Sequence, residues 1–500
     1  MSDSVLSTSS NSYRCKFRPD YKPPNVIGFF SLDGKGEYHN DSQNLQYVKY
    51  LGDQNVAFDL NLDMDKTIHK SSLLDPRLTH FLKFLLDNES RLNFPLSKSF
   101  NESRFYTYRG SLKTICCTPY ENQDSWKMVA TLYRGDIYLA QVVTEEKRMK
   151  VSMESERDVM MTSWGHKFEQ FMISDSPNSK PDLSHPLNAY EEFNLIFQTS
   201  LNDHKLVFGA EMDGILCNPD TEPLEPNMAM DDKIQYFNSN QFVELKTSLH
   251  IYSERQNCNF RRFKARNWWA QSYLVGIEKI ICGFRNNKGV VEYLQAYNLA
   301  DLPQDSKNYW CPNVCINFLD KFLTFVKSSL EKKIIKTLGN KYTLHEADMV
   351  SLSFEYRPND CVRIVEFNPE TDVIVPDWFT KQHAPSSTDQ NSDKPSKSDQ
   401  NNRRSMESES GQSNSTSMNR NQTRATADQR YQNQTRATAD QRYQNQTRAT
   451  KDQPNQTRAT TDQWNHKRTR ATADKPNQTR ATAVQSNRNR TRAIEDQSGN

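Results

Sequence analysis

Short runs of hydrophobic residues, many of them β-branched or aromatic, recur between polar segments along the first three quarters of the chain, and such runs predict β-strands. The predicted strands are 104–108, 127–132, 137–142, 206–212, 242–247, 280–283 and 290–293. Apolar side chains three and four residues apart predict helices in the same part of the chain. The predicted helices are 74–87, 164–173, 188–200, 261–275 and 316–334. Because strands and helices are interleaved, the pattern predicts one α/β body over residues 25–384.

This pattern fades at both ends of the chain. Residues 1–24 are polar and predict a flexible lead. Within the body, the Pro- and Asp-rich segment 218–232 lies between two predicted strands and predicts a surface insertion. From 385 to 500 the triplet Thr-Arg-Ala recurs between polar residues. Such a repeat cannot bury an apolar face, so 385–500 is predicted to be a disordered repetitive tail.

Charge is divided unevenly between body and tail. The chain has 500 residues, with 64 Lys+Arg and 62 Asp+Glu. Residues 385–500 contain 20 basic and 12 acidic side chains, which leaves 44 basic and 50 acidic ones in residues 1–384. The arginines of the tail could contact RNA phosphates without specificity. A spacer that needs no partner fits the same composition equally well.

The composition excludes several classes of protein. No stretch approaches the roughly 18 uninterrupted apolar residues of a membrane helix, and the N-terminus lacks the apolar core of a signal peptide. The nine cysteines are scattered without CxxC pairs, which is not the pattern of a zinc finger or a disulfide framework. We therefore expect reduced thiols in a nucleocytoplasmic protein that makes no membrane contact.

The sequence LVFGAEMD at 206–213 ends a predicted strand in two acids. Side chains alternate between faces along a strand, so Glu211 and Asp213 would point the same way while Met212 packs behind them. Two carboxylates on one face raise each other's pKa unless a cation lies between them. A solvated strand end with two unrelated acids is the alternative.

A second predicted strand, FVELKT at 242–247, places Glu244 and Lys246 on one face and Leu245 on the other. Carboxylates are the hard oxygen ligands that Mg²⁺ and Mn²⁺ prefer, and such a cation activates water for phosphodiester hydrolysis. A nearby lysine would stabilise the negative charge that develops on the phosphate. An ordinary surface ion pair is the alternative, but the two acidic strands together favour a metal site.

Three further side chains are candidates for the same site. Glu169 in WGHKFEQF is a possible additional carboxylate, although a lone glutamate on an amphipathic helix is usually solvated. Gln271 in NWWAQSYLVG interrupts an apolar run, so it faces a cleft or needs a hydrogen-bond partner. Arg109 in FYTYRG could bind an anion bidentately, and a structural ion pair explains it equally well.

Taken in this order along the chain, these motifs resemble the DXO/Rai decapping exonuclease family. Three shorter motifs join the resemblance: CTPYE at 117–121, GFRN at 283–286 and CPNVCINFLDKFL at 311–323. The resemblance spans about residues 26–378, which is the whole predicted body. Each motif alone is weak, whereas the ordered set is specific.

The resemblance implies a role for each candidate residue. The implied metal ligands are Glu169, Glu211, Asp213, Glu244 and the backbone carbonyl of Leu245, with Glu169 completing the site of a second ion directly or through water. The implied catalytic residues are Glu169, Glu211, Asp213, Glu244, Lys246 and Gln271. The implied substrate-binding residues are Arg109, Glu169, Lys246 and Gln271. Among these, Lys246 and Gln271 would hold the attacking water and the scissile phosphate.

The fold implied by the resemblance is α/β, a mixed two-sheet nuclease body with flanking helices and a restriction-nuclease-like core. The implied function is a metal-dependent RNA 5′-end hydrolase that removes triphosphates, unmethylated caps or NAD caps from defective RNAs, with 5′–3′ exoribonuclease activity in some members. Two Mg²⁺ ions are expected, and Mn²⁺ as a substitute. RNA 5′ ends are the expected partners. Some relatives also dock on a nuclear 5′–3′ exoribonuclease, which implies the nucleus as the main compartment and the cytoplasm as a second.

Two features depart from the family pattern. His166 stands where the family usually has tyrosine, which is a change in packing. The stretch between Asp213 and Glu244 is lengthened by the insertion at 218–232, which could alter the rim of the cleft. A non-catalytic adaptor that binds RNA 5′ ends is the main alternative, disfavoured because every acid is present. A DNA endonuclease on the related core is a third.

Overall fold

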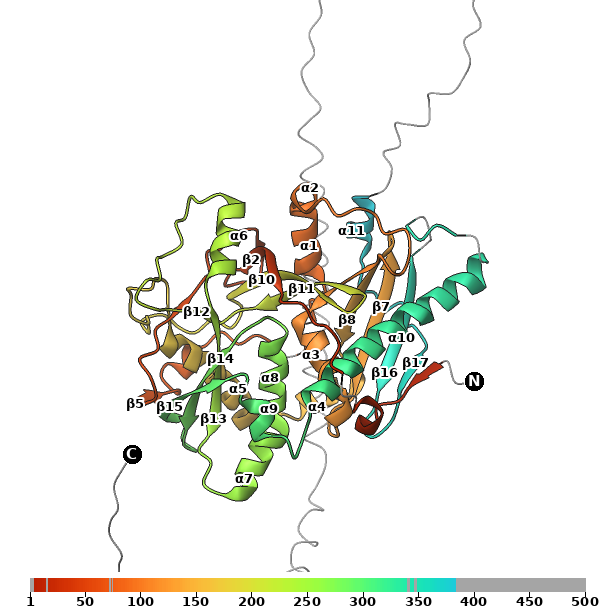
Figure 1. Cartoon of the computed structure of the whole chain (residues 1–500). Helices are drawn as coiled ribbons and strands as arrows, with labels where there is room; N and C mark the ends of the chain where they lie inside the picture. Colours follow the sequence, from red (N-terminus) through yellow and green to blue (C-terminus); the bar gives the residue numbers. More distant parts are fainter. Residues whose placement is uncertain are drawn as a thin grey trace, which may run out of the picture. The chain divides into compact units, whose positions relative to one another are not determined.

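The computed structural model describes residues 4–14, 17–71, 73, 75–339, 342–345 and 349–383. The predicted repeat tail at 385–500 lies outside the described residues. Two mixed β-sheets surrounded by helices make up the described part of the chain (Figure 1). The prediction of a mixed α/β body with two sheets and flanking helices is therefore confirmed.

The larger sheet has ten strands. Their order is β1 (Val5–Leu6), β17 (Val362–Val365), β16 (Val350–Tyr356), β7 (Trp126–Tyr133), β8 (Asp136–Val142), β6 (Arg104–Tyr108), β11 (His204–Glu211), β10 (Glu192–Leu201), β2 (Asn25–Leu32) and β3 (Tyr38–His39). Strand β6 runs parallel to both of its neighbours, β8 and β11, and the other pairs are antiparallel. The parallel pairing brings the carboxyl ends of β6 and β11 to the same edge.

The smaller sheet has seven strands. Their order is β5 (Gln54–Asp59), β15 (Val290–Asn298), β14 (Lys279–Arg285), β13 (Phe242–Leu249), β12 (Gly214–Leu216), β4 (Tyr47–Val48) and β9 (Ile173–Ser174). Only Met212 and Asp213 separate β11 of the larger sheet from β12 of the smaller one. The chain therefore crosses from one sheet to the other at the predicted acidic motif.

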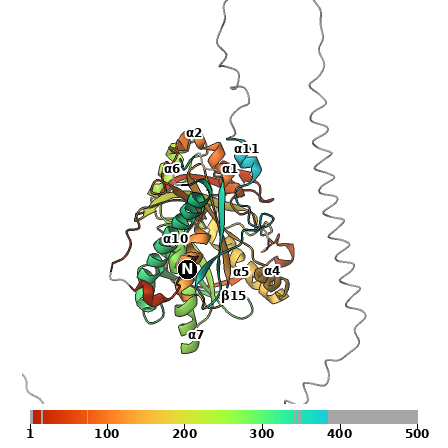
Figure 2. The same cartoon turned by 90° about the vertical axis from the view of Figure 1, so that its right-hand side faces the viewer.

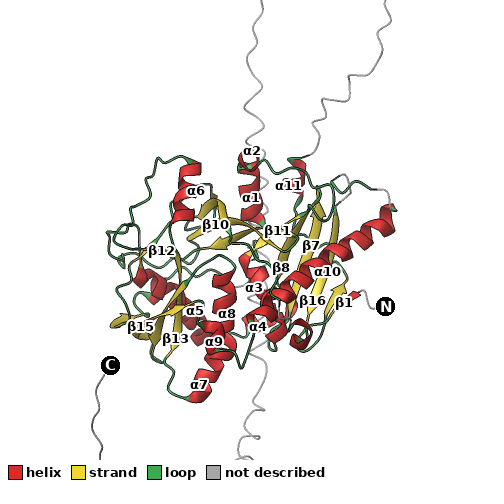
Figure 3. Ribbon diagram, viewed as in Figure 1, coloured by secondary structure: helices red, strands yellow, loops and turns green. Residues whose placement is uncertain are grey.

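Helices cover the sheets and fill the space between them (Figure 3). They are α1 (Thr79–Asp87), α2 (Glu89–Leu92), α3 (Arg109–Cys117), α4 (Glu145–Ser152), α5 (Glu156–Met172), α6 (Met230–Ser239), α7 (Glu254–Asn259), α8 (Ala265–Tyr273), α9 (Leu302–Asp305), α10 (Pro312–Leu338) and α11 (Asp377–Lys381). Shorter turns are η2 (Ser10–Tyr13), η3 (Met64–Lys66), η4 (Thr118–Tyr120) and the π-helical η5 (Phe260–Lys264). Helix α3 contacts both α8 and α10, and α4 and α5 lie on the opposite side of the body from α10 (Figure 2).

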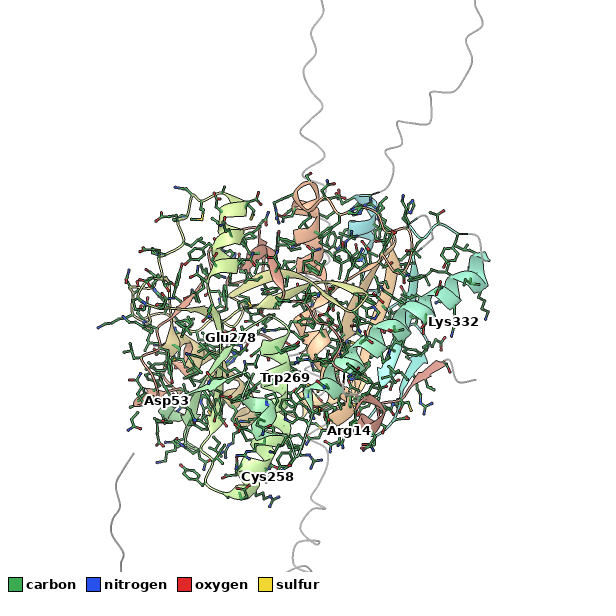
Figure 4. The ribbon with its side chains drawn as sticks, in the orientation of Figure 1. Arg14, Asp53, Cys258, Trp269, Glu278 and Lys332 are labelled. Atoms are coloured by element: carbon green, nitrogen blue, oxygen red, sulfur yellow. The ribbon has the colours of Figure 1, made fainter. Side chains whose placement is uncertain are left out.

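Aromatic packing holds the central helices in place. Trp269 of α8 stacks on Tyr273 with ring centroids 5.0 Å apart and lies 5.3 Å from Trp310, in the middle of the body (Figure 4). Helix α5 packs closely on the smaller sheet, because a Cβ added at Gly283 would lie 2.5 Å from the ring of Phe168. The absence of a side chain at Gly283 therefore sets how near α5 can approach β14.

The predicted strands all lie within β6, β7, β8, β11, β13, β14 and β15, or differ from them only at the ends. The predicted helix at 188–200 is wrong, because strand β10 (Glu192–Leu201) occupies this segment. Strand β10 lies between β11 and β2, and residues 193–197 are all buried. A strand that is covered on both faces reads as an unbroken apolar run, which periodicity cannot distinguish from a buried helix.

The prediction of a flexible lead over 1–24 also differs from the structure. Within the described residues 4–14 and 17–24, β1 pairs with β17, so this segment closes one edge of the larger sheet. Tyr13 is only 7% exposed and packs edge-on against Phe318 of α10, with ring centroids 5.2 Å apart. The polar residues that surround Tyr13 in the sequence predict no order, so the role of this single aromatic side chain could not be predicted from them.

The segment 218–232 is a largely exposed connection that ends in the first residues of α6, as expected of a surface insertion. In the part of the chain that the structure describes, no helix combines the length and the apolar character needed to span a membrane.

Candidate active site

The acidic pair lies at the crossing between the two sheets. Strand β11 ends at Glu211, so Glu211 and Asp213 do not share one strand as the sequence predicted. The side chain of Met212 is buried, as predicted. Its backbone N–H donates to the carbonyl of Phe193 at 2.9 Å. Asp213 Oδ2 accepts the backbone N–H of Leu245 at 2.6 Å. This bond fixes the Asp213 carboxylate beside β13, which carries the second acidic motif.

Glu244 is the buried centre of the site, with 1% of its surface exposed. Its Oε2 accepts a hydrogen bond from Arg109 Nη1 at 3.3 Å, and its Oε1 accepts one from Gln271 Nε2 at 2.5 Å. Lys246 forms an ion pair with the same Oε1. The structure thus brings together Glu244, Arg109, Lys246 and Gln271, all of which the sequence singled out.

Each of these partners is positioned by a different element. Arg109 is the first residue of α3 and directly follows β6, whose parallel pairing with β11 places it near Glu211. Lys246 lies two residues after Glu244 on β13, so both point to one face. Gln271 comes from α8, which packs against α3. Glu169 comes from α5, which packs against β13.

Three of the acids have strongly raised pKa values. Burial raises the pKa of Glu169 well above its ordinary range, and the charges of Asp213 and Glu211 raise it further. Glu211 lies on the wall of a cavity and keeps access to water. Desolvation by the surrounding protein, and then the charge of Glu192, nevertheless raise its pKa to about 8. Burial and then the charge of Glu244 raise the pKa of Asp213 to about 6. The carboxylates repel one another, and a cation bound between them would relieve this repulsion.

Glu244 behaves in the opposite way. Although burial alone would raise its pKa, the charges of Lys246 and Arg109 lower it below its ordinary value. The pKa of Lys246 is raised for the complementary reason: burial opposes its charge, but Glu244 and Asp213 outweigh that cost. Glu244 is therefore ionised and compensated by protein cations, whereas at the other three acids burial and neighbouring carboxylates outweigh the nearby cations.

The donor set fits a hard divalent cation, because it consists of carboxylate oxygens held in a shared, partly desolvated space. Among the described residues, no three His, Cys, Asp or Glu side chains are already grouped closely enough to chelate an ion. The hydrogen bonds explain this arrangement. Glu244 is engaged by its three cationic and amide partners, and Asp213 is engaged by Leu245.

Two cavities meet at this cluster. One, of about 270 Å³, is lined by residues that include Lys70, His80, Arg109, Glu192 and Glu211. The other, of about 870 Å³, is lined by residues that include Gln141, Lys147, Lys246, Asn267 and Trp268. Lys113 and Gln271 line both cavities. A substrate chain could therefore occupy both cavities and pass the acidic cluster between them.

Sequence reasoning missed three residues of this site. Glu192 and Lys70 form an ion pair that lines the smaller cavity, and Glu192 begins the strand that was predicted as a helix. Lys113 lies four residues after Arg109 on α3, a helix that the periodicity did not reveal. A helix assigned to this segment would have placed Lys113 and Arg109 on the same face.

Comparison with known proteins agrees with this geometry. The family described as RAI1 like PD-(D/E)XK nuclease matches residues 22–380, a range that includes every candidate site residue. The chain belongs to the RAI1-like PD-(D/E)XK nuclease family. The resemblance drawn from the ordered motifs is therefore confirmed, and so is the prediction that the protein is a nuclease.

Relatives of this RAI1-like nuclease are found among animals and fungi. The decapping and exoribonuclease protein of Xenopus laevis is 32% identical over 399 residues, which cover 76% of this chain and 90% of that protein. The Homo sapiens protein of the same name is 31% identical over 318 residues, which cover 62% of this chain and 76% of that protein.

Among solved structures, Rai1 of Candida albicans in complex with pU5-Mn²⁺ superposes with a TM-score of 0.58. It is 21% identical, and the alignment covers 75% of this chain and 98% of that one. This likeness shows that the two proteins share the RAI1-like nuclease fold.

Proposed function

We propose that this chain is a divalent-metal-dependent hydrolase of RNA 5′ ends. The observation that carries the proposal is the acidic cluster at the meeting point of two cavities, with Glu244 bound by Arg109, Lys246 and Gln271. The relatives named decapping and exoribonuclease proteins support the same reaction class. The Candida albicans Rai1 complex with pU5 and Mn²⁺ supports a single-stranded RNA substrate and a divalent cofactor.

The residues that would hold the cation are Glu169, Glu211, Asp213, Glu244 and the backbone carbonyl of Leu245. Their number and their spread over β11, the segment that follows it, β13 and α5 support two ions, which we propose to be Mg²⁺ with Mn²⁺ as a substitute. Bound there, a divalent cation would neutralise the repelling carboxylates, polarise the phosphate and lower the pKa of a water molecule.

The protein's own groups supply binding and orientation. Lys246 carries a stable positive charge next to Glu244, so it can stabilise the charge that develops on the phosphate oxygens. Gln271 reaches the same carboxylate through its amide nitrogen and can orient a water molecule through the remaining amide hydrogen and oxygen. Arg109 has a further guanidinium edge for a substrate anion.

The finer assignments are part of the same proposal. We propose that the removed groups are triphosphates, unmethylated caps and NAD caps. A 5′–3′ exoribonuclease activity would follow as a second step. The nucleus would be the main site of action. Docking on a nuclear 5′–3′ exoribonuclease is proposed from the family resemblance alone.

The proposal is tested by incubating the purified chain with five RNAs that differ only in the 5′ end: triphosphate, unmethylated cap, methylated cap, NAD cap and monophosphate. We expect metal-dependent products from at least one of the first four and none in EDTA. Tight binding of the same RNAs without any product, unaffected by Mg²⁺ or Mn²⁺, would instead identify a non-catalytic adaptor.

A further inference from the structure

Lys113 occupies a special position in the candidate active site. It lies on α3 one helical turn after Arg109, so the two side chains project from the same face of the helix. Its side chain is half-buried and lines both the cavity of about 270 Å³ and the cavity of about 870 Å³. Apart from Gln271, no other described residue lines both of these two cavities.

The ammonium group of Lys113 has no hydrogen bond or ion pair with any residue that the structure describes. The neighbouring cations do have an anionic partner, since Arg109 and Lys246 both form ion pairs with Glu244. Glu244 gives Lys113 no hydrogen bond or ion pair, because its Oε2 accepts from Arg109 and its Oε1 accepts from Lys246 and Gln271.

The surroundings of Lys113 disfavour an isolated positive charge. Burial lowers the pKa of Lys113 and outweighs the opposing effect of Cys117, and the charges of Arg109 and Lys246 lower it further against the weaker effect of Glu244. An exposed lysine needs no partner because water solvates it, but a half-buried lysine beside two other cations gains from an anion. Phosphate is the anion that a nucleic-acid substrate would bring into these cavities.

We infer that Lys113 binds a phosphate group of the RNA at the point where the two cavities meet. This inference rests on the proposed function. The phosphate would bridge the basic walls of the site, and Lys113 would fix which nucleotide lies over the acidic cluster. Lys113 is thus a substrate-binding residue distinct from Arg109, Lys246 and Gln271.

The test measures how the affinity for 5′-monophosphorylated RNA depends on salt, by fluorescence anisotropy of the full chain in EDTA. A lysine that contacts a phosphate contributes about 0.7 to the slope of log K against log salt for single strands. We expect Lys113→Met to make this negative slope shallower by about that amount and to weaken binding about tenfold at moderate salt. Lys113→Arg should restore most of both.

Lys336 provides the matched control, because it is exposed on α10 and lines neither cavity. Lys336→Met should keep the wild-type slope. Lys113→Gln, which removes the charge but retains a polar side chain, provides a second measurement if the methionine variant does not fold. A merely structural role for Lys113 would change stability without changing the slope.

The outcome separates two failures. Wild-type protein that hydrolyses RNA 5′ ends, together with Lys113→Met and Lys113→Gln slopes equal to the wild-type slope, would overturn the inference and leave the proposed function intact. Wild-type protein that neither binds nor hydrolyses RNA would overturn both.

Discussion

Glu244 and Asp213 are neighbours in the site, yet their surroundings shift their pKa values in opposite directions. Glu244 is surrounded by cations and an amide, which stabilise its charge. Asp213 has one backbone N–H from Leu245 and the repelling charge of Glu244. The same substitution, from carboxylate to amide, should therefore have opposite effects on the stability of the metal-free protein.

Glu244→Gln should lower the free energy of unfolding in EDTA by about 3 kcal/mol, because it leaves the buried cations without their anion. Asp213→Asn should leave it unchanged or raise it at pH 7.5, because the amide removes a repelled charge and can still accept the Leu245 N–H. Urea denaturation followed by circular dichroism measures both. Equal losses in the two variants would contradict the assignment of Glu244 as the ion-paired centre.

The raised pKa values also predict a pH dependence of stability. The pKa of Glu211 is about 8 and that of Asp213 is about 6, against ordinary values of 4.5 and 3.8. The folded protein binds these protons more tightly than the unfolded chain, so the stabilisation is complete at low pH and is lost as the pH rises through about 6 and about 8.

We therefore expect the Tm in EDTA to fall over this range and to fall less steeply in Glu211→Gln, whose amide does not titrate. Differential scanning fluorimetry across the range provides the comparison. Parallel Tm curves for the wild type and Glu211→Gln would show that Glu211 does not have the raised pKa.

At the scale of the elements, the position of α5 depends on the absence of a side chain at Gly283. A methyl group at Gly283 would lie 2.5 Å from Phe168, and Phe168 directly precedes Glu169. Gly283→Ala should therefore displace α5, destabilise the fold by about 1–3 kcal/mol and lower kcat through Glu169.

Gly165 on the same helix is the control, because an added Cβ there meets nothing within 4 Å. Gly165→Ala should stabilise the protein by about 1 kcal/mol, since alanine is the better helix former. Thermal unfolding and steady-state hydrolysis rates measure both variants. A Gly283→Ala protein with normal stability would mean that α5 can move without cost.

The elements also show what sequence could and could not predict. Strands such as β7 and β13 could be predicted because each is a short run rich in strand-forming residues that is bounded by polar or turn residues. Strand β10 was mistaken for a helix because both of its faces are buried. The edge strand β1 was missed because its pairing with β17 joins segments over 350 residues apart, for which local pattern has no signal.

The same limit applies to the site. Glu211, Asp213, Glu244 and Lys246 could be proposed from strand alternation and paired charges. The contacts of Glu244 with Arg109 and Gln271 could not, because they depend on the parallel pairing of β6 with β11 and on the packing of α8 against α3. The cavities, and Lys113 between them, follow from the same tertiary packing.

On the scale of the whole molecule, the site lies where the chain crosses from the larger sheet to the smaller one. All of the described residues, and with them every site residue, belong to one compact unit. Removal of Asp393–Asn500 should therefore leave the rate of metal-dependent hydrolysis within about twofold of the full chain. Initial rates of both proteins on the same RNA provide the test, and a tenfold loss would mean that the repeat segment takes part in the reaction.

The most direct test of the proposed function is the initial rate of product release from 5′-triphosphate and NAD-capped RNA as Mn²⁺ is titrated. Wild type, Asp213→Asn and the exposed control Asp220→Asn should be compared. We predict saturable Mn²⁺-dependent release by the wild type and Asp220→Asn, and at least a hundredfold loss in Asp213→Asn with its fold retained. Release by Asp213→Asn at the wild-type rate, or by the wild type without any metal, would contradict the proposed site.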